Sequence, residues 1–191
     1  MGSRQKKEER MTLLVIDTQE LLVNRELYGM ERFVDNVRRL IQTARENAVE
    51  VIYVIHDDGP GSELTRGQEG FEVYREFRPL AGEKIFVKQK NSALYGTGLE
   101  EYLKERGEHQ LMAVGLQTDK CVNATIISGF ERGFQMIVPE HANSTVSNSF
   151  MSGEESVSYF NHFLWNGRFA ECVSMETALE RMRGRTGRQR G

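Results

Sequence analysis

The chain has 191 residues, of which 39% are hydrophobic and 28% are charged, a composition typical of a folded globular protein rather than a disordered or fibrous one. A chain of this length can bury a hydrophobic core without disulfides or a structural metal. It has only two cysteines, Cys121 and Cys172, and no apolar run close to the roughly 18 residues that a membrane span needs. These features predict a cytoplasmic protein with a single domain over residues 11–180, and they argue against membrane and disulfide-rich secreted classes.

The charge of the chain is distributed unevenly. The net charge is -3, yet residues 1–10 sum to +2 and residues 181–191 carry five arginines and no acidic residue, which leaves -10 for residues 11–180. An acidic body argues against the broad basic face that nucleic acids require, so we expect no nucleic-acid partner and no membrane partner. We expect the two charged ends to be disordered.

Short apolar runs alternate with segments of helical periodicity along the chain. In chain order, strands are predicted at residues 12–17, 49–56, 84–88, 110–115, 134–139 and 169–173. Helices are predicted at residues 30–47, 99–106 and 122–132, and a glycine-rich surface loop is predicted at residues 57–70. Strands that are apolar on both faces and alternate with helices indicate a three-layer α/β fold, with a central, mostly parallel sheet of about six strands. Ligand sites in such folds lie at the carboxyl ends of the strands, where the strand order reverses.

Three residues with chemically useful side chains fall at these predicted strand ends. Asp17 ends the first strand, Lys88 ends the third, and Cys121 begins the helix after the fourth. Each one alone has an ordinary explanation as a turn residue, a solvated lysine or a small buried thiol. Together they contain the groups of a nucleophilic cysteine site. The ammonium and the helix N-terminus would favour a thiolate, and the carboxylate would accept the thiol proton and pass it to a leaving amine.

Three sequence motifs carry a resemblance to a known family. They are VIDTQ at residues 15–19, KQKNSALYGTGLEEYL at 88–103 and VGLQTDKCVNATIISGFERGF at 114–134. In this order they resemble the isochorismatase-like cysteine hydrolases, which include nicotinamidases and related amidases, over roughly residues 11–180.

The resemblance implies roles for particular residues. It implies a catalytic triad of Asp17, Lys88 and Cys121, and it alone favours Lys88 over the neighbouring lysines 84 and 90. It also implies a cis peptide bond between Leu116 and Gln117, with the backbone amides of Gln117 and Cys121 forming an oxyanion hole.

The chain departs from the nicotinamidase pattern near the expected metal site. Nicotinamidases carry an Asp-x-His pair after the second strand, whereas this chain has His56, Asp57 and Asp58 there. A histidine and two carboxylates are able to bind zinc or manganese, but without a second histidine in view we favour a solvated loop. We therefore expect no metal and no cofactor.

The substrate pocket is the least constrained part of the sequence. Leu94 occupies a position where the family commonly has an aromatic residue, and Tyr95 follows it. For the aromatic residues between 159 and 165 we favour a helix that packs them into the core or into a subunit interface. By analogy with related oligomeric hydrolases, His162 or Trp165 would instead line a pocket, either of this chain or of a neighbouring copy. We expect a homo-oligomer, either a dimer or a tetramer. These differences leave the natural substrate open.

The sequence thus predicts a hydrolase that cleaves the C–N bond of a small carboxamide through a thioester. Two alternatives stay open. One is vinyl-ether hydrolysis of the isochorismatase type, in which Asp17 protonates the substrate. The other is a non-catalytic module that binds a small ligand or a partner chain.

Overall fold

The computed structural model describes residues 10–184 and contains one seven-stranded sheet. Six strands follow the order β3-β2-β1-β4-β5-β7, β6 pairs with β4 beyond the end of β5, and every pair is parallel. The strands are β1 (Met11–Ile16), β2 (Glu50–His56), β3 (Lys84–Lys88), β4 (Gln110–Leu116), β5 (Gln135–Pro139), β6 (Asn143–Ser144) and β7 (Glu171–Val173). The predicted parallel α/β class is confirmed. The sequence did not indicate β6, because two residues are too few to produce a periodic pattern.

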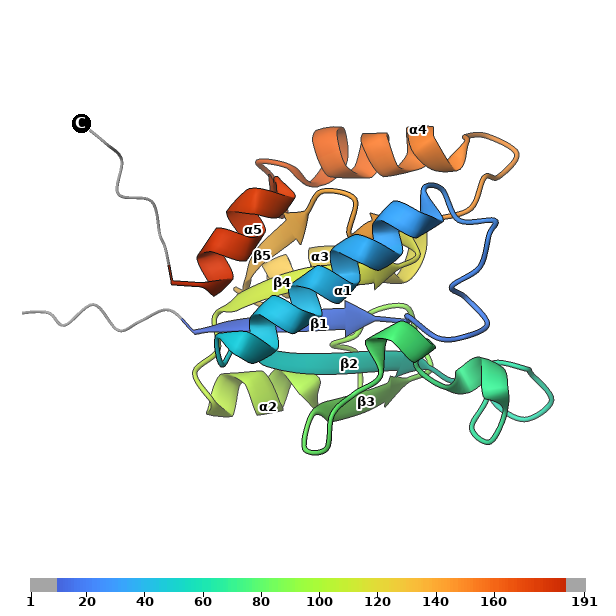
Figure 1. The fold of residues 1–191 in the computed structure, drawn as a ribbon, viewed down its shortest axis with the longest axis horizontal. Helices are drawn as coiled ribbons and strands as arrows, with labels where there is room; N and C mark the ends of the chain where they lie inside the picture. Colours follow the sequence, from blue (N-terminus) through green and yellow to red (C-terminus); the bar gives the residue numbers. More distant parts are fainter. Residues whose placement is uncertain (1–9, 185–191) are drawn as a thin grey trace, which may run out of the picture.

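Helices cover both faces of this sheet, with α1 and α5 on one side and α2 and α3 on the other (Figure 1). The helices are α1 (Met30–Glu46), α2 (Leu99–Glu105), α3 (Asn123–Glu131), α4 (Gly153–Ser158) and α5 (Met175–Met182). Shorter helical turns are η1 (Glu69–Phe71), η2 (Arg75–Phe77), η3 (Thr118–Val122) and η4 (Tyr159–Trp165). Helices α4 and α5 were not predicted, and α5 runs two residues past the expected domain limit at 180. Most of the two expected disordered ends, residues 1–9 and 185–191, lies outside the described residues.

The core is divided by the sheet into two hydrophobic clusters. In β1, Leu13 and Val15 belong to the cluster beneath α1 and α5, whereas Leu14 and Ile16 belong to the cluster beneath α2 and α3. This division follows from the two-residue period of a strand, which sends successive side chains to opposite faces. Each of these side chains is fully buried, and such burial is worth roughly 1.5–3 kcal/mol relative to exposure in water.

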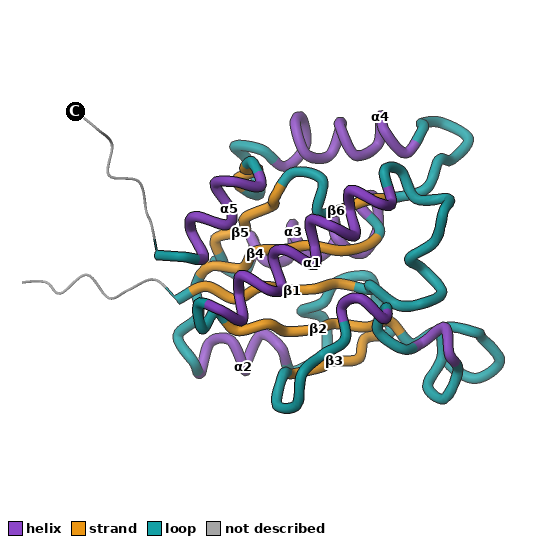
Figure 2. The backbone as a smooth tube through the Cα atoms, viewed as in Figure 1, coloured by secondary structure: helices purple, strands orange, loops and turns teal. Residues whose placement is uncertain are grey.

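The strand order reverses between β1 and β4, since the chain passes from β1 outward to β2 and β3 before it returns to β4. Here Gly115 pairs with Ile16 and has φ of 128°, and a Cβ atom at this position would lie 2.0 Å from the Ile16 carbonyl oxygen. Only glycine permits this close approach of the two strands. The loops that leave the strands gather at the same edge of the sheet (Figure 2). Within residues 10–184, none of the helices has the length and apolar character needed to cross a membrane.

Candidate active site

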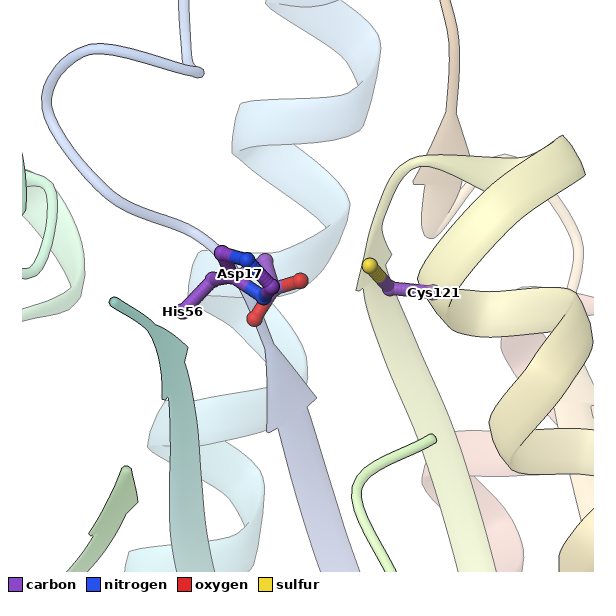
Figure 3. Close-up of side chains that lie close together, drawn as sticks. All are labelled: Asp17, His56 and Cys121. Carbon is purple, nitrogen blue, oxygen red and sulfur yellow. The ribbon is translucent and has the colours of Figure 1, made fainter. Parts of the chain in front are cut away.

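The three residues predicted to form a site converge at the reversal point of the sheet. Asp17 directly follows β1, Lys88 is the last residue of β3, and Cys121 lies in η3 after β4. Lys88 Nζ lies 2.7 Å from Asp17 Oδ2 and 3.2 Å from Cys121 Sγ. Figure 3 shows the sulfur of Cys121 pointing from its helix toward Asp17 at the end of β1. An acid, an ammonium and a thiol that are distant in sequence therefore meet within hydrogen-bonding distance.

Burial distinguishes Lys88 from the neighbouring lysines. Its side chain has no exposed area and that of Asp17 is 3% exposed, whereas Lys84 and Lys90 are exposed. Because β2 separates β3 from β1 in the sheet, the lysine side chain reaches Asp17 past the end of β2. Asp17 leaves β1 with φ of 49°, in the left-handed region that aspartate tolerates better than most residues. This turn lies next to the glycine of β4 at the strand reversal.

Burial and the Asp17 charge both favour the protonated form of the Cys121 sulfur. Burial raises the pKa of the Cys121 thiol to about 12, with the Asp17 charge adding to this effect and the Lys88 ammonium opposing it. Burial also raises the pKa of Asp17, again opposed by Lys88. The sequence predicts a thiolate, but in the structure burial and the neighbouring carboxylate outweigh the ammonium in their effect on the thiol pKa. Asp17 Oδ1 is buried and has no hydrogen-bond partner within residues 10–184, so a proton acceptor is available beside the thiol.

A buried polar network holds the helical turn that carries Cys121. The peptide bond between Leu116 and Gln117 is cis, as the resemblance implies. Thr118 Oγ1 then donates to Asn143 Oδ1 at 2.8 Å, and Asn143 Nδ2 donates to Asn161 Oδ1 at 3.0 Å. The network ties η3 to β6 and η4. Neither asparagine was predicted from the sequence, because an isolated polar residue gives no local signal of burial.

The four residues expected to line a substrate pocket separate into two pairs. Leu94 is 4% exposed and Trp165 is fully buried, with the Trp165 indole N–H donating to Asn123 Oδ1 at 3.0 Å. Both side chains belong to the cluster beneath α2 and α3, so they pack in the core and not on an accessible surface. Tyr95 is 63% exposed, and His162 is exposed beside Ser158.

A different residue lies near the sulfur at the surface. Asn91 Oδ1 is 3.8 Å from Cys121 Sγ, and Asn91 is exposed on the segment that follows β3. This carboxamide is positioned to contact a molecule bound at the thiol. The sequence analysis did not single it out, although it lies inside the motif that begins at Lys88.

The residues considered for a metal site have other partners. The Asp57 carboxylate accepts hydrogen bonds from the Gly59 amide at 2.9 Å and the Thr65 hydroxyl at 2.7 Å, and so stabilises its own loop. Donor atoms of Asp17, His56 and Cys121 do lie within 4.8 Å of one another. The Lys88 ammonium, however, is within hydrogen-bonding distance of all three. It supplies the positive charge that a metal ion would bring, so these residues do not fit a metal site.

Comparisons with known proteins agree with this architecture. Residues 11–176 match the Isochorismatase domain. YddQ of Bacillus subtilis, an uncharacterized isochorismatase family protein, is 28% identical over 183 residues, which cover 88% of this chain and 98% of the relative. An isochorismatase-family structure from Chromobacterium violaceum superposes with a TM-score of 0.86 at 25% identity, covering 92% of this chain and 95% of the other. N-carbamoylsarcosine amidase of Thermoplasma acidophilum superposes with a TM-score of 0.73 at 25% identity, covering 87% and 97%. The chain therefore belongs to the isochorismatase family of hydrolases.

Proposed function

We propose that this protein is a cysteine-dependent amidohydrolase that cleaves the C–N bond of a small carboxamide through a thioester. One observation carries the proposal: a single buried ammonium, that of Lys88, contacts both the Asp17 carboxylate and the Cys121 sulfur. Such a carboxylate and thiol are the base and nucleophile that acyl transfer requires. The amidase name of the Thermoplasma acidophilum relative agrees with this reaction class.

In the first half-reaction, Asp17 takes the thiol proton as Cys121 Sγ attacks the carbonyl carbon. Lys88 stabilises the negative charge on the sulfur as it develops. The backbone amides of Gln117 and Cys121 receive the oxyanion of the tetrahedral intermediate. Asp17 then gives its proton to the nitrogen, the C–N bond breaks, and ammonia or an amine leaves.

In the second half-reaction, Asp17 takes a proton from water, and the oxygen of that water attacks the thioester carbonyl. Collapse of the second intermediate releases a carboxylic acid and returns the proton to the sulfur. The raised pKa of Asp17 suits both roles, because a carboxyl group with a raised pKa is a better base when ionised and holds its proton longer.

We also propose that the protein acts as a homo-oligomer in the cytoplasm. Phe163 and Tyr159 of η4 are 73% and 40% exposed, and their two adjacent rings, tilted by 37°, offer an apolar contact to a second copy. Cys121 and Cys172 are both free thiols, in keeping with a reducing compartment.

The test is a panel of small carboxamides and ring imides, with release of ammonia or amine measured and mass spectrometry used to detect an adduct on Cys121. Cys121→Ala should abolish cleavage while the protein stays folded. Cys172→Ala is the matched control, because this second thiol lies in β7, and it should keep full activity. Undiminished cleavage by Cys121→Ala would remove the nucleophile from the proposal.

Vinyl-ether hydrolysis is the second candidate, and the raised pKa of Asp17 also favours it. A carboxyl group that keeps its proton is able to protonate a vinyl-ether carbon directly, without attack by sulfur. A thioester trapped on Cys121 during turnover would exclude this mechanism. Turnover of a vinyl ether by Cys121→Ala would support it. If the protein consumed neither carboxamides nor vinyl ethers, that result would favour a non-catalytic binding module.

A further inference from the structure

His56 lies at the end of β2, between the strands that carry Asp17 and Lys88. The β2–β3 register pairs it directly with Lys88. Its ring nitrogen Nδ1 is 2.9 Å from Lys88 Nζ, and its other ring nitrogen Nε2 is 3.0 Å from Asp58 Oδ1. Figure 3 shows the imidazole beside Asp17, facing the same space as the sulfur of Cys121.

The two partners of the imidazole determine where its proton lies. A lysine ammonium is only a donor, so Nδ1 must accept from Lys88 and carries no proton. An ionised carboxylate is only an acceptor, so Nε2 must carry the proton that is donated to Asp58. His56 is therefore a neutral imidazole with its proton on Nε2.

This assignment completes the hydrogen bonding of the Lys88 ammonium. The ammonium has three N–H groups, and the structure provides three acceptors: Asp17 Oδ2, His56 Nδ1 and Cys121 Sγ. Because the lysine side chain has no exposed area, solvent water does not reach it to replace a missing acceptor. Loss of any one of the three would leave a buried charged donor unsatisfied.

We propose that His56 is a positioning residue, whose neutral Nδ1 holds the Lys88 ammonium between Asp17 and Cys121. The inference rests on the proposed function, since it assigns His56 to the machinery of the cysteine nucleophile. It acts through the lysine and forms no bond with the substrate.

The backbone of His56 is fixed independently of its side chain. The His56 amide donates to Gln19 Oε1 at 2.8 Å, and Gln19 Nε2 donates to the His56 carbonyl at 2.9 Å. Gln19 is fully buried and lies two residues after Asp17 in the first motif. Gln19 thereby fixes the backbone position from which the His56 imidazole reaches Lys88.

Two substitutions separate the acceptor from the bulk of the side chain. His56→Asn places an amide oxygen near the position of Nδ1 and keeps an acceptor, whereas His56→Leu keeps similar volume without one. His109→Asn is the matched control, because His109 is exposed and precedes β4 at the opposite edge of the sheet. The readout is the rate at which iodoacetamide alkylates Cys121, followed by mass spectrometry of the peptide so that Cys172 is counted separately.

We expect His56→Leu to lower the alkylation rate by about tenfold or more, and His56→Asn to restore it to within about threefold of the unmodified protein. His109→Asn should react at the original rate. Equal rates for folded His56→Leu and the unmodified protein would overturn the inference, as would equal losses in His56→Leu and His56→Asn.

Long-range ¹H–¹⁵N spectra of the imidazole provide a second measurement that needs no His56→Leu protein. At about pH 7.5 the His56 ring should show an unprotonated Nδ1 and a protonated Nε2, assigned by the signals that disappear in His56→Asn. A proton on Nδ1 would overturn the inference. Neither experiment depends on cleavage of a C–N bond, so failure to cleave every carboxamide in the panel would count against the proposed function and leave the role of His56 in place.

Discussion

Replacing Lys88 by methionine removes the ammonium that pairs with Asp17 and keeps most of the side-chain volume. In the folded protein the Asp17 carboxylate would then be buried without its cation. Removing one partner of a buried ion pair costs about 3–5 kcal/mol of unfolding free energy. The two side chains are 0% and 3% exposed, so solvent screening does not reduce this value. For a domain of this size the loss corresponds to a fall of roughly 6–20 °C in Tm.

The loss should depend on pH in a defined direction. The pKa of Asp17 is already raised above its ordinary value of 3.8 by burial, and Lys88 opposes that rise. Without Lys88 the carboxyl binds its proton more tightly still. A group whose pKa is raised by folding stabilises the folded state below its unfolded pKa, and this contribution is lost as the pH rises through the folded pKa. Lys88→Met should therefore be most destabilised near neutral pH and recover as the pH falls toward 3.8.

Urea denaturation at several pH values, followed by circular dichroism, measures both effects. The matched control is Lys84→Met, which removes an exposed lysine from the same strand and should change the unfolding free energy by no more than about 0.5 kcal/mol. Adding Asp17→Asn to Lys88→Met should recover stability at neutral pH, because no buried charge then remains at that position. If Lys88→Met left the unfolding free energy at neutral pH unchanged, that result would refute the contribution of the buried ion pair.

Two further predictions concern Cys121 and the strand reversal. Asp17→Asn removes a charge that raises the pKa of the Cys121 thiol. Alkylation of Cys121 by iodoacetamide at about pH 8 should therefore become roughly tenfold faster, while amide cleavage is lost. Slower alkylation would contradict the electrostatics described for the site. Gly115→Ala should cost about 2–4 kcal/mol in urea denaturation, because its Cβ would lie 2.0 Å from the Ile16 carbonyl oxygen. Gly133→Ala, at a positive φ with open space around it, should cost only about 1 kcal/mol, and an equal cost at both glycines would show that close approach is not the cause.

The strands and helices that were predicted from local patterns occur in the structure as the same type of element and in the same order along the chain. Leu13 to Ile16 are apolar at every position, which indicates a strand buried on both faces, and the structure places them alternately in the two clusters. Strand β6 was missed because two residues produce no periodic pattern, and helices α4 and α5 were not predicted either. His162 and Trp165 were placed in a pocket by analogy alone, and a tryptophan in the sequence looks the same whether it packs in a core or lines a pocket; the structure buries Trp165 fully.

The sequence by itself determined the fold class and the three chemical groups at the strand ends, because strand periodicity is a local property of the chain and every parallel sheet has the carboxyl ends of its strands at one edge. Only the tertiary structure decided which lysine enters the site and which residue completes its hydrogen bonds. Lys88 is separated from Asp17 by 71 positions and from Cys121 by 33, and His56 meets it across a strand pair. Burial of the lysine, and burial of the thiol that raises the pKa of Cys121, arise only when these segments pack together and exclude water.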